Sequence, residues 1–175
     1  TTFGPDIRLG RRGQFRGSLT NDNRGGPGDA SITHFDTFGY TLENLLTFDK
    51  AITDNQNLKV TLLQSTQNSR SEFSIASVTG IPYESQAFHN LGSADNSIVD
   101  SSLSEWTLNS FMGRINYDIA GKYLFQASLR ADGSSRLAEG NKWNYFPGVS
   151  AGWRISQEDF MAESAISELK LRASY

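Results

Sequence analysis

The sequence predicts an all-β chain whose antiparallel strands form part of the wall of a transmembrane β-barrel. Apolar and polar residues alternate from Lys122 to Tyr175 through three successive strand-like segments. The middle segment, Trp143 to Ile155, is longer than the roughly 9–11 residues that a tilted strand needs to cross a bilayer. The connections between strands are alternately long and short, as in outer-membrane barrels. Because a period of two places successive side chains on opposite faces, we expect one face toward lipid and the other toward a polar lumen.

This alternation divides the candidate residues into two sets. The residues expected to face lipid, including an aromatic girdle, are Tyr123, Phe125, Leu129, Trp143, Tyr145, Val149, Trp153, Ile155 and Leu171. The residues expected to face the lumen are Arg114, Asn116, Asp118, Arg130, Asp132, Arg154, Lys170 and Arg172. Aromatic residues collect at both membrane–water interfaces, so Trp143 is expected high on the barrel and Trp153 and Tyr123 low. Carbohydrate stacking by Trp143 or Tyr145 at the outer rim is the alternative for those two rings.

The chain divides at about residue 36. Residues 1–36 are rich in Gly, Arg, Asn and Asp, with Gly25-Gly26-Pro27-Gly28 as the strongest turn signal, so they are predicted to be mainly an extracellular loop. A short strand from Gly13 to Thr20 is expected inside that loop. Residues 37–175 are predicted to be the barrel segment. Its strands are expected at 37–49, 58–78, 104–118, 122–132, 143–156 and 168–175.

The connections set the orientation of these strands. The long loop 80–103 and the solvated loop 133–142 are assigned to the extracellular side, because barrels have longer loops there and short turns in the periplasm. The tight turn 119–121 is then periplasmic. So is a short helix expected over roughly Glu158 to Ile166, since Ser156 to Asp159 resembles a helix N-cap followed by an acid. Trp106 and Leu108 break the parity of their strand, so a bulge near Ser110 is expected, and Pro147 predicts a second one.

Composition excludes several classes of function. No run of about 18 apolar residues exists, so no transmembrane helix is expected, and the net charge of -3 without a basic block argues against nucleic-acid binding. Cysteine is absent, and His34 and His89 are isolated, so neither a thiolate nor a histidine metal site is predicted. No nucleophile elbow or Ser/His/Asp group stands out. We therefore expect neither an enzyme nor a cofactor.

The expected lumen face of residues 104–175 is basic in a chain that is acidic overall. It carries five cationic side chains against the carboxylates of Asp118 and Asp132. One interpretation is that this surface contacts an acidic plug or guides an anionic substrate. The alternative is a generic polar interior whose charges are paired locally.

Several runs of residues carry a family resemblance. They are 104–117, 122–124 with 127–130, 132–136, 143–156, and 160–161 with 169–175. Together they resemble the SusC/RagA-type TonB-dependent outer-membrane transporters. The resemblance is dense over 104–175, loose over 37–103 and faint before that.

The resemblance implies a large transporter in the outer membrane of a Gram-negative, Bacteroidetes-like cell. Such a barrel is closed by an internal plug, energised by the TonB complex through that plug, and covered by a SusD-like lipoprotein that helps capture glycans or peptides. No stretch of this sequence resembles the plug or a TonB box, so the resemblance implies a fragment of the wall, of six or seven strands. The partners expected are outer-membrane lipid, the SusD-like lipoprotein and the TonB complex, with no nucleic acid.

Two other fold hypotheses are consistent with alternating strands. A complete small outer-membrane barrel would need an even number of strands, against six clear strands and one weak one. A soluble β-sandwich, such as a carbohydrate-binding module, also has alternating strands. Sandwich strands are usually five or six residues long, however, and a soluble outer face does not carry large apolar side chains over thirteen positions. Burial of Phe125, Val149, Trp153 and Leu171 in a dry core between two sheets would favour the sandwich.

Overall fold

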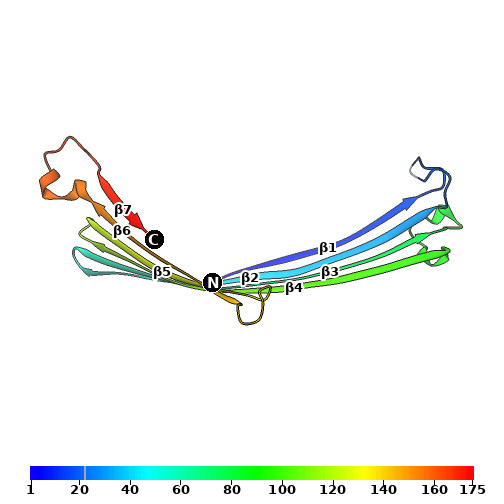
Figure 1. Cartoon of the computed structure of the whole chain (residues 1–175), viewed down its shortest axis with the longest axis horizontal. Coiled ribbons are helices and arrows are strands. Elements are labelled where there is room, and N and C mark those ends of the chain that lie inside the picture. The colour runs from blue at the N-terminus through cyan, green and yellow to red at the C-terminus, as the bar shows by residue number, and fades with distance from the viewer. Residues whose placement is uncertain (22) are drawn as a thin grey trace. The chain divides into compact units, whose positions relative to one another are not determined.

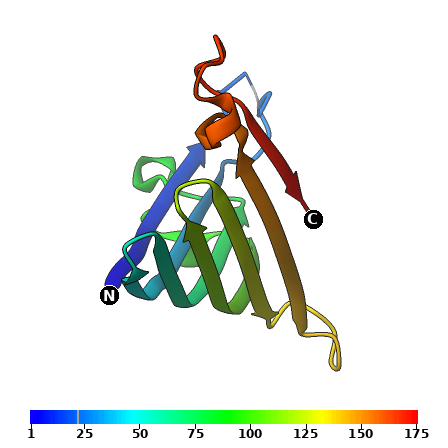
Figure 2. The same cartoon turned by 90° about the vertical axis from the view of Figure 1, so that its left-hand side faces the viewer.

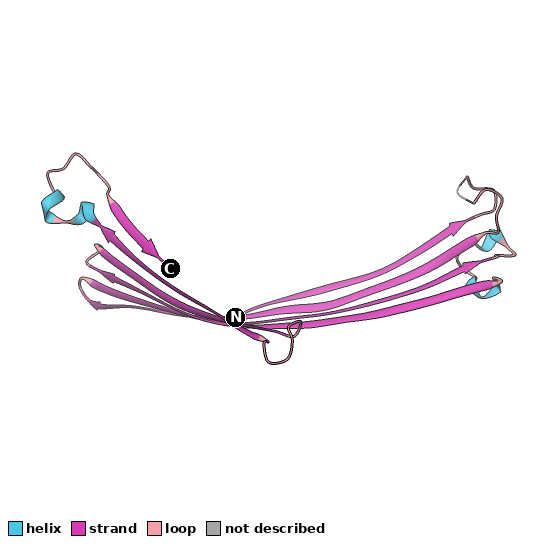
Figure 3. Cartoon of the chain, in the orientation of Figure 1, coloured by secondary structure: helices cyan, strands magenta, loops and turns pink. Residues whose placement is uncertain are grey.

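The computed structural model describes residues 1–21 and 23–175, and it confirms the all-β fold. The strands form one sheet in chain order, so each strand lies next to its neighbours in the sequence (Figure 1). They are β1 (Thr2–Arg16), β2 (Asp29–Thr53), β3 (Gln56–Thr79), β4 (Asn96–Ile119), β5 (Tyr123–Ser134), β6 (Trp143–Arg154) and β7 (Lys170–Ser174). Short 3-10 helices lie only in connections of the described chain (Figure 3): η1 (Glu84–Gln86), η2 (Leu91–Ser93), η3 (Ile155–Gln157) and η4 (Asp159–Met161).

None of the helices in the described ranges is long and apolar enough to cross a membrane.

The chain divides into two compact units that share the long strands. The first unit contains residues 1–3, 41–67 and 107–175, and the second contains 4–40 and 68–106. Strands β2, β3 and β4 contribute to both, with 25, 24 and 24 residues respectively. Each is more than twice as long as the roughly 9–11 residues that a tilted strand needs to cross a bilayer.

In the first unit, β4 to β7 pair in antiparallel register without interruption. The β4–β5 ladder runs from Leu108 opposite Ser134 to Ile119 opposite Tyr123. The β5–β6 ladder runs from Tyr123 opposite Trp153 to Gly133 opposite Trp143. Each residue has one partner, so the bulge predicted near Ser110 is not formed in the β4–β5 ladder.

Pro147 also lies in a regular ladder, opposite Leu129. The neighbouring Val149 exchanges both backbone hydrogen bonds with Tyr175, each 2.9 Å long. Residues of the same parity as Val149 therefore direct their N–H groups away from β5, toward the β7 side. Because Pro147 has that parity, its missing N–H removes no bond from the β5–β6 ladder, and the predicted bulge is unnecessary.

The two faces of β5 and β6 differ in exposure. Phe125, Leu129 and Val149 are 48%, 52% and 53% exposed, whereas the polar residues between them are half-buried. An antiparallel sheet with one apolar face open is not a sandwich, in which that face packs against a second sheet. The sandwich alternative, which needed a dry core around Phe125 and Val149, is therefore wrong, and the barrel-wall prediction is confirmed.

The second unit has a small apolar core of its own. Ala30, Val78 and Ile81 are buried there, and Phe15 and Phe88 pack against them. The connection 17–28 is tied to the connection 80–95, because the backbone N–H of Ser18 donates to Glu84 Oε1 at 2.7 Å. That hydrogen bond lowers the pKa of Glu84. The two connections are therefore held together by packing and by a charge-assisted hydrogen bond.

The prediction that residues 1–36 are mainly loop is wrong, because Thr2–Arg16 forms β1 and β2 begins at Asp29. Two glycines of β1 make room for aromatic rings. The ring of Phe35 lies over Gly10, and the ring of Phe88 lies over Gly13. The placement of this region on the extracellular side stays a prediction.

The helix predicted over Glu158 to Ile166 is shorter than expected, since within that range only η4 forms, and η3 precedes it (Figure 2). The hydroxyl of Ser156 is buried and has no hydrogen-bond partner, so it does not act as an N-cap. Glu158, which directly precedes the acid of the predicted cap, Asp159, bonds to side chains of β5 and β6. The predicted loop 80–103 is shorter than expected as well, because β4 already begins at Asn96.

Candidate functional site: a basic groove on the polar face

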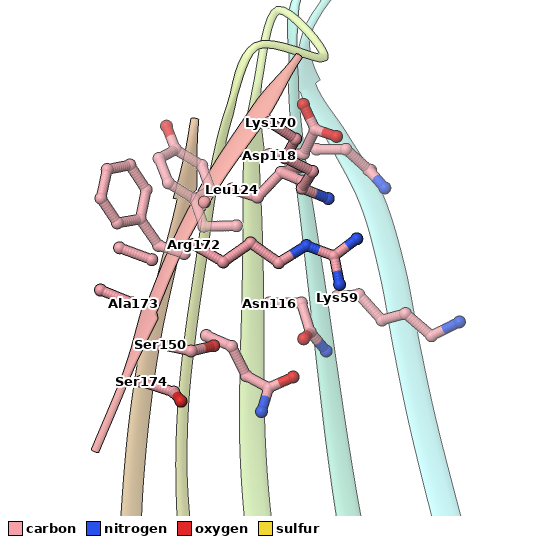
Figure 4. Close-up of a pocket in the computed structure, with 15 residues that line it drawn as sticks. Lys59, Asn116, Asp118, Leu124, Ser150, Lys170, Arg172, Ala173 and Ser174 are labelled. Carbon is pink, nitrogen blue, oxygen red and sulfur yellow. The ribbon is translucent and has the colours of Figure 1, made fainter. Parts of the chain in front are cut away.

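The polar face of the first unit contains an open groove of about 540 Å³ (Figure 4). Strands β3, β4, β5 and β7 each supply polar side chains to it. The long polar and charged side chains among them are Lys59, Asn116, Asp118, Gln126, Lys170 and Arg172. In Figure 4 the side chains of Lys170, Arg172 and Asn116 extend to one side of the sheet. The groove therefore gathers polar groups from strands far apart in the sequence.

One of the cations passes beside a glycine on β6. Gly152 lies opposite Arg172 on β7 and opposite Leu124 on β5. A Cβ atom at Gly152 would lie 3.4 Å from Cε of Lys170 and 3.6 Å from Cβ of Leu124. Both distances are ordinary van der Waals contacts, so the stem of Lys170 passes beside Gly152, and Lys170 lines the groove.

The groove has an excess of positive charge. Within the described ranges, Lys170 and Arg172 have no carboxylate oxygen within 4.0 Å, and Lys59 has a loose partner in Asp49 at 3.7 Å. Asp118 is the carboxylate that lines the groove, and its Oδ1 accepts the backbone N–H of Gly121 at 2.7 Å, which closes the tight turn after β4. The groove therefore attracts anions.

The other expected lumen residues lie elsewhere. Arg130 forms an ion pair with Asp132 at 2.9 Å and donates to Ser110 Oγ at 3.2 Å, as the local-pairing alternative proposed. Arg114 and Arg154 do not line the groove and have no carboxylate partner in the part of the chain that is described. The structure thus brings together Asn116, Asp118, Lys170 and Arg172 and separates them from the rest of the predicted set.

Sequence reasoning missed Lys59 and Gln126 as groove residues. The signal for Lys59 was available, because it lies between Leu58 and Val60, and a side chain between two apolar neighbours points to the opposite face. The sequence did not predict that residues of β3 and β7 line the same groove, because that depends on the register in which the strands between them pair.

A second polar cluster ties the β6–β7 connection to the start of β5. Oε1 of Glu158 accepts the hydroxyl of Tyr123 at 2.7 Å and the indole N–H of Trp153 at 2.9 Å, while Oε2 pairs with Nζ of Lys122 at 3.1 Å. We call Glu158, Tyr123, Trp153 and Lys122 the Glu158 clamp. The hydrogen bonds from Tyr123, Trp153 and Lys122 lower the pKa of Glu158 to about 2. The hydrogen bond to Glu158 raises the pKa of Lys122.

The clamp changes what is expected of the lower girdle residues. The rings of Tyr123 and Trp153 stack with centroids 6.5 Å apart, and the polar atom of each is bound by Glu158. Ile155 belongs to η3 and is half-buried, so its predicted place on the β6 strand is wrong. The chain leaves the strand after Arg154 to reach the clamp.

The remaining residues of the apolar set lie on an open face. Tyr145 and Leu171 are 65% and 60% exposed. Trp143 stacks against Phe111 at 6.1 Å between ring centroids and covers Gly133. These positions fit a girdle, and contact of this face with lipid stays a prediction.

A line of hydrogen-bonded polar side chains crosses the apolar face of the sheet from β2 to β4. We call it the polar ladder, and it consists of Thr1, Asn44, Gln64, Thr66 and Asn109. Asn44 accepts from Thr1 at 2.8 Å and donates to Gln64 at 2.7 Å. Thr66 accepts from Gln64 and donates to Asn109, both at 2.9 Å. Asn44 is a polar residue between Leu42 and Leu46 on the apolar face of β2. The polar ladder explains how it is tolerated there, because the amide of Asn44 has a hydrogen-bond partner on each side.

No group of three or more His, Cys, Asp or Glu side chains that could hold a metal ion occurs among residues 1–21 and 23–175.

Comparison with known proteins identifies the class as TonB-dependent receptors. Over its whole length the chain is 33% identical to TonB-dependent receptor P26 of Formosa agariphila and 32% identical to receptor P3 of the same organism, covering 18% of each. It is also 43% identical over 70 residues, 39% of the chain, to TonB-dependent receptor SusC of Bacteroides thetaiotaomicron, of which it covers 7%. No family model matches the chain.

The fold agrees with this class. The chain superposes on a chain of the RagAB peptide transporter with a TM-score of 0.86 and 21% identity, over 98% of this chain and 19% of that one. The comparisons confirm the family recognised from residues 104–175: the chain corresponds to a barrel segment of SusC/RagA-type TonB-dependent receptors. It spans about 18% of the length of the curated relatives that match it over its whole length.

Proposed function

We propose that the chain forms part of the barrel wall of a TonB-dependent transporter that imports a glycan- or peptide-like nutrient across the outer membrane of a Bacteroidetes-like cell. In this role its residues are wall and loops, and it is not an enzyme. The partners are outer-membrane lipid, a SusD-like lipoprotein on the cell surface and the TonB complex acting through a plug. The receptors named above support the transport role.

One observation carries the proposal: from Tyr123 to Arg130 on β5 and from Pro147 to Gly152 on β6, exposed apolar residues of one face alternate with half-buried residues of the other. In water, an open row of Phe, Leu, Val and Tyr side chains is unfavourable, whereas hydrocarbon accepts it. A lumen face, in contrast, takes polar and charged residues. The alternation therefore supports a wall between lipid and a wet interior.

The lengths of β2, β3 and β4 support a wall that continues beyond the bilayer. Only part of each strand is needed to cross the hydrocarbon. The second unit, with its own small core and tied connections, is therefore proposed to lie outside the hydrocarbon, on the extracellular side.

Labelling of single introduced cysteines gives a direct test, and this chain contributes no native cysteine to the background. Single cysteines at Phe125, Leu129 and Val149, and at Gln126, Ser128 and Ser150, would be introduced one at a time into the parent transporter and labelled with a nitroxide in lipid vesicles. We expect the first three labels to be accessible to dissolved oxygen, which concentrates in hydrocarbon. The second three should be accessible to a water-soluble paramagnetic nickel chelate. Equal accessibility of the two sets, or the reverse order, would refute the proposed wall.

A further inference from the structure

We propose that the basic groove binds a cargo that carries two or more carboxylate groups, an inference that rests on the proposed transport function. The groove carries cations that the protein itself does not neutralise. Lys170 and Arg172 have no carboxylate within 4.0 Å in the described chain, and Lys59 has only a loose one. Elsewhere in the same unit, Arg130 and Lys122 are closely paired with Asp132 and Glu158. Arg114 and Arg154 also lack a carboxylate partner in the described chain, but they do not line the groove, so the groove is where Lys59, Lys170 and Arg172 are gathered around one cavity and available to one ligand.

The cations of the groove are spread across several strands. Lys59 lies on β3 and Arg172 on β7, with three strands between them. Neighbouring strands lie about 4.8 Å apart, so these cations are spread over roughly 19 Å of sheet. A single small anion cannot contact all of them, whereas an oligomer with several carboxylates can.

The cations and the polar side chains between them suit a carboxylate-bearing oligomer. Arg172 offers a planar fork that matches a carboxylate, and the two lysines offer point charges. The amides of Asn116 and Gln126 provide neutral donors and acceptors for the rest of an oligomer. The aromatic residues that line the cavity, Tyr117 and Phe125, have the parity opposite to Asn116 and Gln126, so their rings are directed to the other face of the sheet and away from the cations.

Two sources supply this chemistry: an acidic peptide and an oligosaccharide of uronic acids. Binding of triglutamate and of trigalacturonate to the detergent-solubilised parent transporter would be measured by calorimetry at low salt, with triglutamine and maltotriose as their neutral counterparts. At least one acidic ligand should bind more tightly than its neutral counterpart, and the ligand that does identifies the source. Added salt should weaken that binding, because exposed charges are screened.

The variant Lys170→Gln/Arg172→Gln removes two charges from the groove. We expect it to weaken the Kd for the acidic ligand by about tenfold. The variant Arg8→Gln/Lys142→Gln removes the same charge from exposed sites outside the groove and should change the Kd by less than about twofold. Folding of each variant would be checked by the heat-dependent shift of the barrel on gels. If the first pair of substitutions prevents folding, Lys59→Gln, at a half-exposed side chain, replaces it.

Equal affinity for acidic and neutral ligands, or equal losses in the groove variant and the control, would overturn the proposed site. Because binding is measured in detergent without TonB, this result is separate from import. A parent protein that binds the acidic ligand through the groove but imports nothing would contradict the proposed function and leave the site intact.

Discussion

The indole Nε1 of Trp153 donates a 2.9 Å hydrogen bond to Oε1 of Glu158, five residues further along the chain. The hydroxyl of Tyr123, which lies opposite Trp153 in the β5–β6 ladder, donates to the same oxygen at 2.7 Å. One carboxylate thus fixes the polar atoms of two stacked aromatic rings and joins the β6–β7 connection to the start of β5. Tyr and Trp usually have a hydrogen-bond partner where they are partly buried, and here the protein supplies it.

Replacing Glu158 should separate the hydrogen bonds of the clamp from its ion pair. Glu158→Gln keeps an oxygen that can accept from Tyr123 and Trp153 but loses the charge that pairs with Lys122. Glu158→Ala loses both. We expect the melting temperature of the parent transporter to fall in both variants, and further in Glu158→Ala. Glu163→Ala, at an exposed position of the same connection, is the control and should be neutral. Equal melting temperatures for wild type and Glu158→Ala would show that the clamp is not needed.

The clamp should also make stability depend on pH in two windows. The pKa of Glu158 is lowered from 4.5 to about 2, so its contribution to stability is fully present above about pH 4.5 and is lost as the pH falls toward 2. The pKa of Lys122 is raised above 10.5, so its contribution is present below that pH and is lost as the pH rises through the higher value.

The measurement is the difference in melting temperature between wild type and Glu158→Gln across the pH range. We expect this difference to be constant between about pH 5 and 9, to shrink in acid as Glu158 is protonated, and to shrink again in strong alkali as Lys122 loses its proton. Because the other carboxylates titrate alike in both proteins, their contribution to the pH dependence cancels in this difference. A difference that grows on acidification would contradict the direction assigned to the pKa of Glu158.

Much of the fold could be predicted because a period of two is a local property of the sequence. The strands β5 and β6 were predicted to within two residues at each end, since their alternation of apolar and polar residues is nearly unbroken. β1 was missed because its glycines and charges suggest a loop. What makes it a strand is pairing with β2, and the Phe35 ring over Gly10 is a contact across that pair. Tertiary pairing overrode local propensity there.

The candidate site was predictable only in part, for a related reason. Parity placed Asn116, Asp118, Lys170 and Arg172 on the polar face, and the groove contains all four. Parity cannot say which residues of one face are close together across several strands, because that depends on register. Register therefore separated Arg130, paired with Asp132, from the groove.

The contact between Gly133 and Trp143 predicts a site where a methyl group is not tolerated. A Cβ at Gly133 would lie 2.7–2.9 Å from three ring carbons of Trp143, so the indole would have to move away from its stack on Phe111. We expect Gly133→Ala to lower the unfolding free energy of the parent barrel by about 1 kcal/mol or more, measured by urea unfolding in lipid vesicles.

Gly113→Ala is the matched control. Gly113 lies on β4 on the same face, and its added Cβ would meet only Leu62 Cδ2 at 3.7 Å, an ordinary contact. We expect this variant to be neutral or slightly stabilising, because alanine has less backbone freedom to lose on folding. If the two alanine variants were equally stable, the packing of Trp143 over Gly133 would not constrain the strand.

The polar ladder predicts a cost for removing a single hydroxyl from the apolar face. Thr66 accepts from Gln64 and donates to Asn109, so Thr66→Val keeps the shape of the side chain but leaves both amides without that partner. Unpaired polar groups shielded from water cost about 1–3 kcal/mol each, and in hydrocarbon no water replaces the lost bond. We therefore expect Thr66→Val to lower the unfolding free energy of the parent barrel in lipid vesicles by at least about 1 kcal/mol.

Thr47→Val is the control, at an exposed residue of β2 on the opposite face, and should change the unfolding free energy by less than about 0.5 kcal/mol. If the two valine variants unfold at the same urea concentration, the amides of the ladder are hydrated at this position, and the face around them is open to water and not to lipid.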